Sequence, residues 1–107
     1  MKPLGEFEEL VLLAVCILDD NAYGITVKKE VEKHTRRTTL LGAVHITLYR
    51  LQDKGLLKSE LGGASEERGQ RRKRLFRATK KGMELLRSSQ EVRQKMWSLI
   101  PRLSTNI

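Results

Sequence analysis

The chain has 107 residues, of which 21 are Lys or Arg and 13 are Asp or Glu, giving a formal net charge of +8. This length supports one domain and leaves little room for a second core, which argues against an enzyme with a deep pocket. The basic excess favours a polyanionic partner, and it is concentrated, because residues 58–81 hold nine Lys or Arg and three Glu, a net of +6.

The first predicted helix spans residues 5–19 and carries three glutamates in its opening turn, where the helix dipole favours acidic side chains. Its apolar run, residues 10–18, is expected at the centre of the core. The run is too short for a membrane span, which needs about 20 residues, and the acidic residues before it are unlike a signal peptide. With a single cysteine, Cys16, expected as a small buried hydrophobe, the chain is predicted to be cytoplasmic and to have no membrane partner.

A second helix is predicted after a turn at residues 19–21, and it begins near Ala22. Its apolar face has i, i+4 spacing and consists of Tyr23, Val27 and Val31. Residues 35–39 form a polar linker, one of whose threonines is expected to cap the next helix. Arg36 and Arg37 of this linker are candidate contacts for a nucleic acid.

The third predicted helix has two distinct faces. Its core face repeats at 3, 4, 3 spacing and consists of Leu41, Val44, Leu48 and Leu51. At about 100 degrees per residue the opposite face holds Ala43, Ile46, Arg50 and Asp53. This outward face is the part of the helix that would enter the major groove of DNA. The candidate DNA-contacting residues of the helix are Gly42, Ala43, His45, Ile46, Thr47, Tyr49 and Arg50.

Side-chain chemistry gives several of these candidates a specific role. Arg50 can pair bidentately with a guanine or a phosphate, and the alternative is a salt bridge to Asp53 three residues on. Tyr49 and Thr47 can donate hydrogen bonds to phosphates. Ile46 either touches a thymine methyl group or is an ordinary exposed hydrophobe.

A basic β-hairpin is predicted to follow this helix. Residues 57–61 alternate as a strand, two glycines break the pattern, and an arginine-rich second strand covers residues 71–77. Phe76 must face the core, so alternation directs Arg71 and Lys73 outward. The candidate DNA contacts of the hairpin are Arg68, Arg71, Arg72, Lys73 and Arg74. A helix followed by a basic β-hairpin is typical of a winged helix, in which the helix enters the major groove of DNA and the hairpin contacts the DNA backbone.

The last predicted helix follows Thr79 and runs from Lys80 towards Ile100, where Pro101 stops it. It carries a coiled-coil-like seam with one polar position, formed by Leu85, Ser89, Val92, Met96, Leu99 and Leu103. Because the seam lies far beyond the hairpin, its expected partner is the same helix of a second copy, giving a twofold dimer. The alternative is that the seam folds back on the first helix, and both arrangements can hold on different faces. Trp97, beside the seam, is expected in the dimer interface.

Four segments together resemble the PadR family of bacterial transcriptional regulators, specifically its short members with one C-terminal dimerisation helix. They are LGEFEELVLLAV at residues 4–15, AYGI at 22–25, GAVHITLYRLQDKGLL at 42–57 and LFRATKKG at 75–82. The chain departs from the family at His45, where the family usually has tyrosine; the histidine is then a packed or half-exposed side chain, a phosphate contact or a pH-sensitive switch. The resemblance also implies a pore between the two C-terminal helices, in which Trp97 and Met96 would bind a small aromatic or cationic effector.

The sequence therefore predicts a mainly α fold with a two-stranded β-hairpin. A winged helix-turn-helix domain, residues 1–79, and a C-terminal dimerisation helix and tail, residues 80–107, are expected to form one compact unit. The predicted function is that of a homodimeric repressor of PadR type that binds double-stranded DNA at a pseudo-palindromic operator. The alternatives are a non-sequence-specific architectural nucleic-acid-binding protein and a protein-interaction winged-helix module. We expect no catalytic residues, cofactor or metal, because Cys16, His34 and His45 fall on separate helices without ligand spacing.

Overall fold

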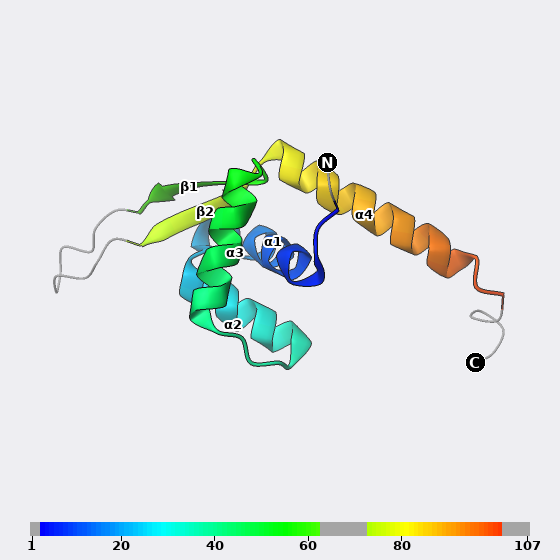
Figure 1. The fold of residues 1–107 in the computed structure, drawn as a ribbon, viewed down its shortest axis with the longest axis horizontal. Coiled ribbons are helices and arrows are strands. Elements are labelled where there is room, and N and C mark those ends of the chain that lie inside the picture. Colours follow the sequence, from blue (N-terminus) through cyan, green and yellow to red (C-terminus); the bar gives the residue numbers. More distant parts are fainter. Residues whose placement is uncertain (1–2, 63–72, 102–107) are drawn as a thin grey trace.

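The computed structural model describes residues 3–62 and 73–101 and shows a mainly helical fold with one antiparallel hairpin (Figure 1). In chain order, the elements are α1 (Glu6–Leu18), the short 3₁₀ turn η1 (Asp19–Asn21), α2 (Gly24–Thr35), α3 (Leu41–Asp53), β1 (Leu57–Leu61), β2 (Arg74–Ala78) and α4 (Lys80–Ser98). This order confirms the fold class predicted from the sequence. Four predicted site residues lie outside the described ranges, namely Arg68, Arg71, Arg72 and Leu103.

The hydrophobic core lies between α1, α2 and α3 and is closed by the hairpin. The apolar half of α1 occupies its centre, as its composition predicts, because this helix contacts α2, α3, β2 and α4. The largest fully buried side chains are Phe76, Leu12, Leu48, Leu51, Leu56, Val11, Val15, Val27 and Val44. Their burial is the main source of stability, since each large apolar side chain removed from water contributes about 1.5–3 kcal/mol.

Two residues that the sequence places in the core lie at its edge instead. Leu41 is 38% exposed, because it begins α3 among the exposed residues 40–43 and the first turn of the helix lies outside the packed core. Cys16 is half-buried, because its Sγ faces Met83 of α4, with 3.3 Å between the two sulfur atoms, rather than the centre of the core.

Local hydrogen bonds explain where α2 and α3 begin. The backbone N–H of Tyr23 donates to Thr26 Oγ1 at 2.8 Å, which satisfies a donor at the start of α2. The residue that precedes α3 is Leu40, which makes no capping hydrogen bond, so the expectation that a linker threonine caps this helix is wrong. The backbone N–H of Thr39 instead donates to Glu32 Oε2 at 2.8 Å, and this bond ties the linker to α2.

The hairpin is attached to the helices at both of its strands. β1 and β2 are antiparallel, with Leu61 opposite Arg74. The N–H of Phe76 in β2 donates to the carbonyl of Ala22 at 2.9 Å, which joins the hairpin to the segment before α2. Gly55 has a φ of 78°, a conformation that residues with a side chain rarely adopt, and it lets the chain turn from α3 into β1.

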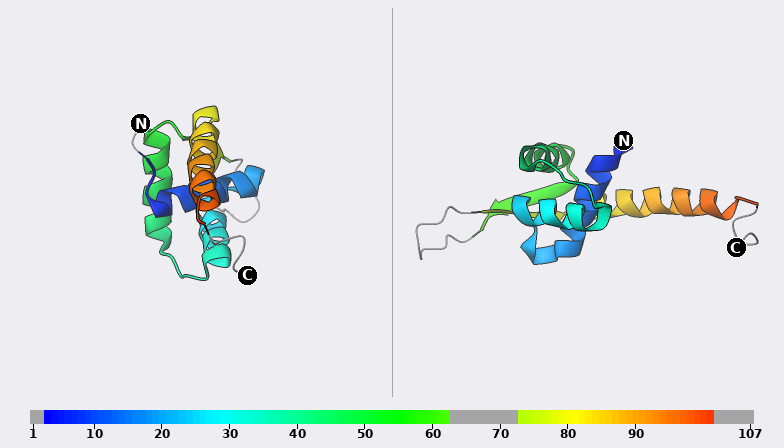
Figure 2. Two further views of the ribbon diagram at one scale, coloured as in Figure 1. Left: turned by 90° about the vertical axis from the view of Figure 1, so that its right-hand side faces the viewer. Right: turned by 90° about the horizontal axis from the view of Figure 1, so that it is seen from below.

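α4 leaves the body of the molecule on the side opposite to the hairpin (Figure 1, Figure 2). α4 begins after Thr79, as the sequence predicts, and Thr79 caps it: its Oγ1 accepts from the N–H of Gly82 at 3.0 Å and donates to the carbonyl of Gly55 at 2.8 Å. Only the first half of α4 contributes a buried side chain, since Leu86 is buried whereas all residues from 90 to 101 are exposed. Among the described helices, none is long and apolar enough to cross a membrane.

Candidate nucleic-acid interface

The outward face of α3 is open to solvent. Ala43, Ile46 and Arg50 lie exposed on it, as the periodicity predicts, and Ile46 is 61% exposed. Gly42 is also exposed, and a Cβ atom added there would meet no other described atom within 4 Å. This end of α3 is therefore accessible to a large partner.

Thr47 lies on the other side of the helix. It is only 5% exposed, because it follows Val44 by one turn and adjoins Leu48, and both of these residues are fully buried. The expectation that Thr47 flanks the outward face and donates to a phosphate is therefore wrong.

Tyr49 and Arg50 lie where α3 meets the hairpin. The Tyr49 ring packs edge-on against Phe76, with 5.7 Å between the ring centroids and 78° between the planes, while the tyrosine stays exposed. Arg50 forms no ion pair with any residue in the described ranges, so the alternative salt bridge to Asp53 is not formed. Both side chains can therefore reach a bound polyanion.

His45 packs against the first residue of α2. A Cβ atom added to Gly24 would collide with the His45 ring and would lie 2.8 Å from its Nε2. The ring fits only because position 24 has no side chain, and His45 is nevertheless exposed to solvent. Of the interpretations for this histidine, the structure shows the packed and solvent-exposed one, and the phosphate contact and the pH switch stay predictions.

Three cations in or next to β2 have different surroundings. Lys73 is exposed, and its Nζ lies 5.7 Å from the centre of the Tyr23 ring. Arg74 is half-buried on the same face of β2 as Phe76, as strand alternation predicts, and Arg77 lies on the opposite face. Lys73 is thus the most accessible of the three.

The linker arginines precede α3 and are both exposed. Arg36 ends α2 in a left-handed conformation, with a φ of 58°. Arg37 Nη2 lies 3.5 Å from Glu6 Oε1, and both of these side chains are exposed. Because exposed ion pairs contribute little to stability, a phosphate can replace Glu6 as the partner of Arg37.

The predicted seam of α4 divides into two parts. Leu85 packs against the core, and Ser89 Oγ donates to Glu9 Oε2 of α1 at 2.7 Å, so the first part contacts its own domain. The second part is exposed, with Met96 at 65%, and consists of Val92, Met96 and Leu99. The fold-back alternative thus describes the first part, and the second part stays a predicted dimer surface.

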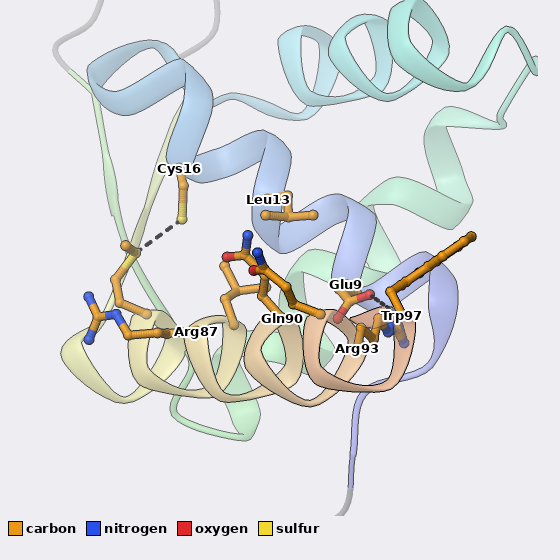
Figure 3. A pocket seen from close by; sticks show the side chains of 10 residues that line it. Glu9, Leu13, Cys16, Arg87, Gln90, Arg93 and Trp97 are labelled. Atoms are coloured by element: carbon orange, nitrogen blue, oxygen red, sulfur yellow. Dashed lines mark hydrogen bonds and ion pairs between the residues drawn. The ribbon is translucent and has the colours of Figure 1, made fainter. Parts of the chain in front are cut away.

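A groove of about 660 Å³ separates α1 from α4 (Figure 3). Its apolar lining consists of Leu13, Cys16, Met83, Leu86 and Trp97. Trp97 therefore lines the groove on one flank of α4, about 100° around the helix from Met96. Arg93 Nη1 donates to Glu9 Oε1 at 3.1 Å beside the tryptophan. Burial raises the pKa of the Cys16 thiol, which disfavours the reactive thiolate.

Sequence reasoning missed four residues that position elements of the candidate interface or of α4. They are Glu9, Gly24, Gln52 and Ser59. Glu9 had a signal in the acidic opening turn, and Gly24 lies within the AYGI segment. Gln52 and Ser59 had none, because their roles depend on contacts between separate elements. Within residues 3–62 and 73–101, no three His, Cys, Asp or Glu side chains gather as they would around a metal ion.

Comparisons with known proteins agree with this geometry. The model of the family described as "Transcriptional regulator PadR-like family" matches residues 12–88, well over half of the chain. No curated protein matches the sequence. Among solved structures, a PadR-like transcription factor from Bacteroides fragilis is 18% identical, with a TM-score of 0.72 over 91% of this chain and 88% of the other.

A PadR family transcriptional regulator from Eggerthella lenta is 23% identical, with a TM-score of 0.69 over 95% of this chain and 88% of the other. A PadR family transcription regulator from Clostridium difficile is 24% identical, with a TM-score of 0.65 over 87% of this chain and 95% of the other. At such identities the solved structures support the fold alone.

Proposed function

Because the chain belongs to the PadR-like family of transcriptional regulators, we propose that it is a cytoplasmic homodimeric repressor that binds a pseudo-palindromic operator in double-stranded DNA. The observation that carries this proposal is the exposed outward face of α3, which holds Arg50 without an ion-pair partner among the described residues. α3 also contacts the basic strand β2 through Tyr49 and Phe76. An α-helix exposed in this way has the dimensions to enter the major groove.

The side chains of α3 supply the chemistry for reading bases. The Arg50 guanidinium can donate two hydrogen bonds to one guanine, and the exposed Ile46 side chain can contact a thymine methyl group. Ala43 and Gly42 are small and exposed, so they permit close approach of the helix to the DNA. Tyr49 can donate to a phosphate from its position above Phe76.

Cations that precede and follow α3 in the chain are proposed to bind the DNA backbone. Arg36 and Arg37 precede the helix, and Lys73 follows it in the chain, immediately before β2. The sequence adds Arg71 and Arg72, whose positions lie outside the described residues. Such contacts fix the register of the protein on the duplex, while base contacts specify the sequence.

The exposed apolar part of α4 supports the homodimer. Val92, Met96 and Leu99 are large apolar side chains that none of the described residues covers. A second copy related by a twofold axis would bury them against an identical surface. The same symmetry would present two α3 helices to two half-sites about 34 Å apart, which is why we propose a pseudo-palindromic operator.

We further propose that α4 binds a small aromatic or cationic effector beside its tryptophan. A hollow of about 310 Å³ is lined by Arg93, Met96, Trp97 and Ile100. An indole ring stacks on flat compounds and attracts cations through its π face. Trp97 is the only tryptophan in the chain, so quenching of its fluorescence would report the binding of such a compound directly.

Selection of DNA from a randomised duplex pool, followed by a footprint on the selected duplex, tests the proposed function. A protected inverted repeat supports the sequence-specific regulator. Uniform coverage without a selected sequence would indicate the architectural protein. If the protein shifts no DNA in a gel-mobility assay, even at low salt, the protein-interaction module would be indicated.

The contribution of the hairpin can be measured separately through the dependence of affinity on salt. Each phosphate contact adds about 0.9 to the slope of log affinity against log salt. Arg71→Ala with Lys73→Ala removes two proposed contacts per protomer, so we expect the slope to fall by up to about four units per dimer. Fluorescence anisotropy of the labelled, selected duplex over a salt series measures this slope, and an unchanged slope would show that the hairpin does not hold the DNA backbone.

A further inference from the structure

A chain of three polar side chains links α3 to both strands of the hairpin. Arg74 Nη1 donates to Ser59 Oγ at 3.0 Å, and Ser59 Oγ in turn donates to Gln52 Oε1. Gln52 belongs to the last turn of α3, Ser59 to β1 and Arg74 to β2, and all three residues are half-buried. The Ser59 hydroxyl therefore accepts a hydrogen bond from β2 and donates one to α3.

The strand register explains why these side chains meet. Ser59 lies opposite Phe76, and Leu61 lies opposite Arg74. Ser59 and Arg74 therefore project from the same face of the hairpin as the buried Phe76. That face packs on α3, because Phe76 contacts Tyr49.

Where the hairpin meets α3, the hydrogen-bonded chain differs in kind from the aromatic contact beside it. The edge-on contact between Tyr49 and Phe76 is apolar, whereas hydrogen bonds through a shared hydroxyl fix both distance and direction. Arg74 is also two residues nearer to the hairpin tip than Phe76. The polar chain therefore holds the outer ends of the described strands, at Leu61 and Arg74, relative to α3.

We propose that Arg74 is a positioning residue that sets the angle between the hairpin and α3 through Ser59 and Gln52, and that it is not one of the phosphate contacts. This inference rests on the proposed function and corrects the role that the sequence assigns to Arg74. Its exposed neighbour Lys73 keeps the role of a phosphate contact. Loss of the polar chain would leave the base contacts of α3 in place and misdirect the hairpin.

A double-mutant cycle tests the proposal, with the duplex that the unmodified protein selects from a randomised pool as the probe. Ser59→Ala and Arg74→Ala should each weaken binding by about five- to tenfold, the size of effect expected for the net loss of one ordinary hydrogen bond. The double variant should lose no more affinity than the single variant that binds less tightly, because both substitutions break the same hydrogen-bonded chain.

The dependence of affinity on salt separates positioning from phosphate contact. Arg74→Ala should leave the slope of log affinity against log salt unchanged, whereas loss of a phosphate contact would reduce it by about 1.8 per dimer. Lys73→Ala is the matched control and should show that reduction. A reduced slope for Arg74→Ala, or additive losses in the double variant, would overturn the proposal.

Ser59→Thr keeps the hydroxyl and should restore the affinity that Ser59→Ala loses. In a hydroxyl-radical footprint, Ser59→Ala should lose the protection that flanks each half-site and keep the protection at its centre. Full affinity of Ser59→Ala would overturn the inference while leaving the proposed function intact. Failure of the unmodified protein to select any duplex would instead be a failure of the proposed function.

Discussion

α3 and α4 are both amphipathic, yet their apolar faces have different surroundings. In α3 the apolar face is covered by the chain's own core, where Val44, Leu48 and Leu51 are fully buried. Its outward face carries both polar and apolar side chains. In α4 only Leu86 among the large apolar residues is buried, and the second half exposes several of them, including Met96. α3 therefore exposes mainly a surface suited to a polar partner, whereas α4 exposes apolar surface suited to another protein.

The largest effect is expected when charge is placed on the exposed apolar part of α4. Val92→Glu with Met96→Glu would bury two unpaired carboxylates if a second copy covers this face, at a cost of about 3–5 kcal/mol. Light scattering at micromolar concentration should then show a dimer for the unmodified protein and a monomer for the variant.

A control on the same helix distinguishes this effect from added charge alone. Gln94→Glu with Ser98→Glu introduces two carboxylates at exposed positions on the side of α4 that faces away from Val92, Met96 and Leu99, and the protein should stay dimeric. A monomeric unmodified protein would refute the assignment of α4, and a dimeric Val92→Glu, Met96→Glu variant would move the interface elsewhere.

The corresponding change in α3 should affect DNA rather than association. Arg50→Ala should cost about 1–3 kcal/mol on the selected duplex if the guanidinium reads a base edge, and much less on random duplex. Tyr49→Phe should weaken binding to both duplexes alike, because a phosphate contact carries no sequence information. Anisotropy titrations measure all four affinities, and equal losses for Arg50→Ala on the two duplexes would reassign this arginine to the backbone.

Periodicity predicted the buried faces of both helices because the 3.6-residue repeat is a local property of the chain. It gave Val44, Leu48 and Leu51 as core residues, and all three are fully buried. It could not specify what covers each face. For the seam that begins at Leu85 it left two partners open, a second copy and the first helix, and the structure shows Leu85 packed against its own core and Met96 exposed.

Residues at the edge of a face were the least predictable. Thr47 adjoins the outward face by angle, yet it is buried because its neighbours in space belong to the core. Trp97 lies beside the seam and lines the groove between α1 and α4, and its place in a dimer interface stays a prediction. Contact between Gly24 and the His45 ring joins two helices, so no local pattern could reveal it.

Gly24→Ala sharpens the description of the α3 surface with little effect on the fold. The new Cβ atom collides with the His45 ring, but this ring is the end of an exposed side chain and can rotate away. Alanine also favours the helix by roughly 0.5–1 kcal/mol over glycine. We therefore expect the free energy of unfolding to change by less than about 1 kcal/mol, while the NMR resonance of the His45 ring shifts.

The effect of that displacement on DNA follows from a second cycle. If the His45 ring contacts the DNA backbone, Gly24→Ala and His45→Ala should weaken binding to the selected duplex equally. The double variant should then lose no more than either single variant, since both remove the same ring from its place. Additive losses in anisotropy titrations would show that Gly24 acts independently of the histidine.

The smallest expected effect concerns an ionic link at the C-terminal end of α3. Lys54 Nζ donates to Glu8 Oε2 of α1 at 2.8 Å. This hydrogen bond is the main reason why the pKa of Glu8 is lowered; a hydrogen bond from the Gly5 N–H and the charge of Arg50 lower it further, while burial opposes the shift. Protonation of Glu8 should therefore weaken the contact between α1 and α3.

A carboxyl group whose pKa is lower in the folded than in the unfolded state stabilises the fold above its unfolded pKa, and the contribution is lost as pH falls through the folded pKa. The unmodified protein should be more stable than Glu8→Gln at neutral pH, and the difference should shrink below about pH 4.3. Urea unfolding over a pH series measures it. Glu6→Gln is the control, because Glu6 is 79% exposed and its pair with Arg37 contributes little. A difference that stays constant with pH would show that Glu8 acts through packing rather than charge.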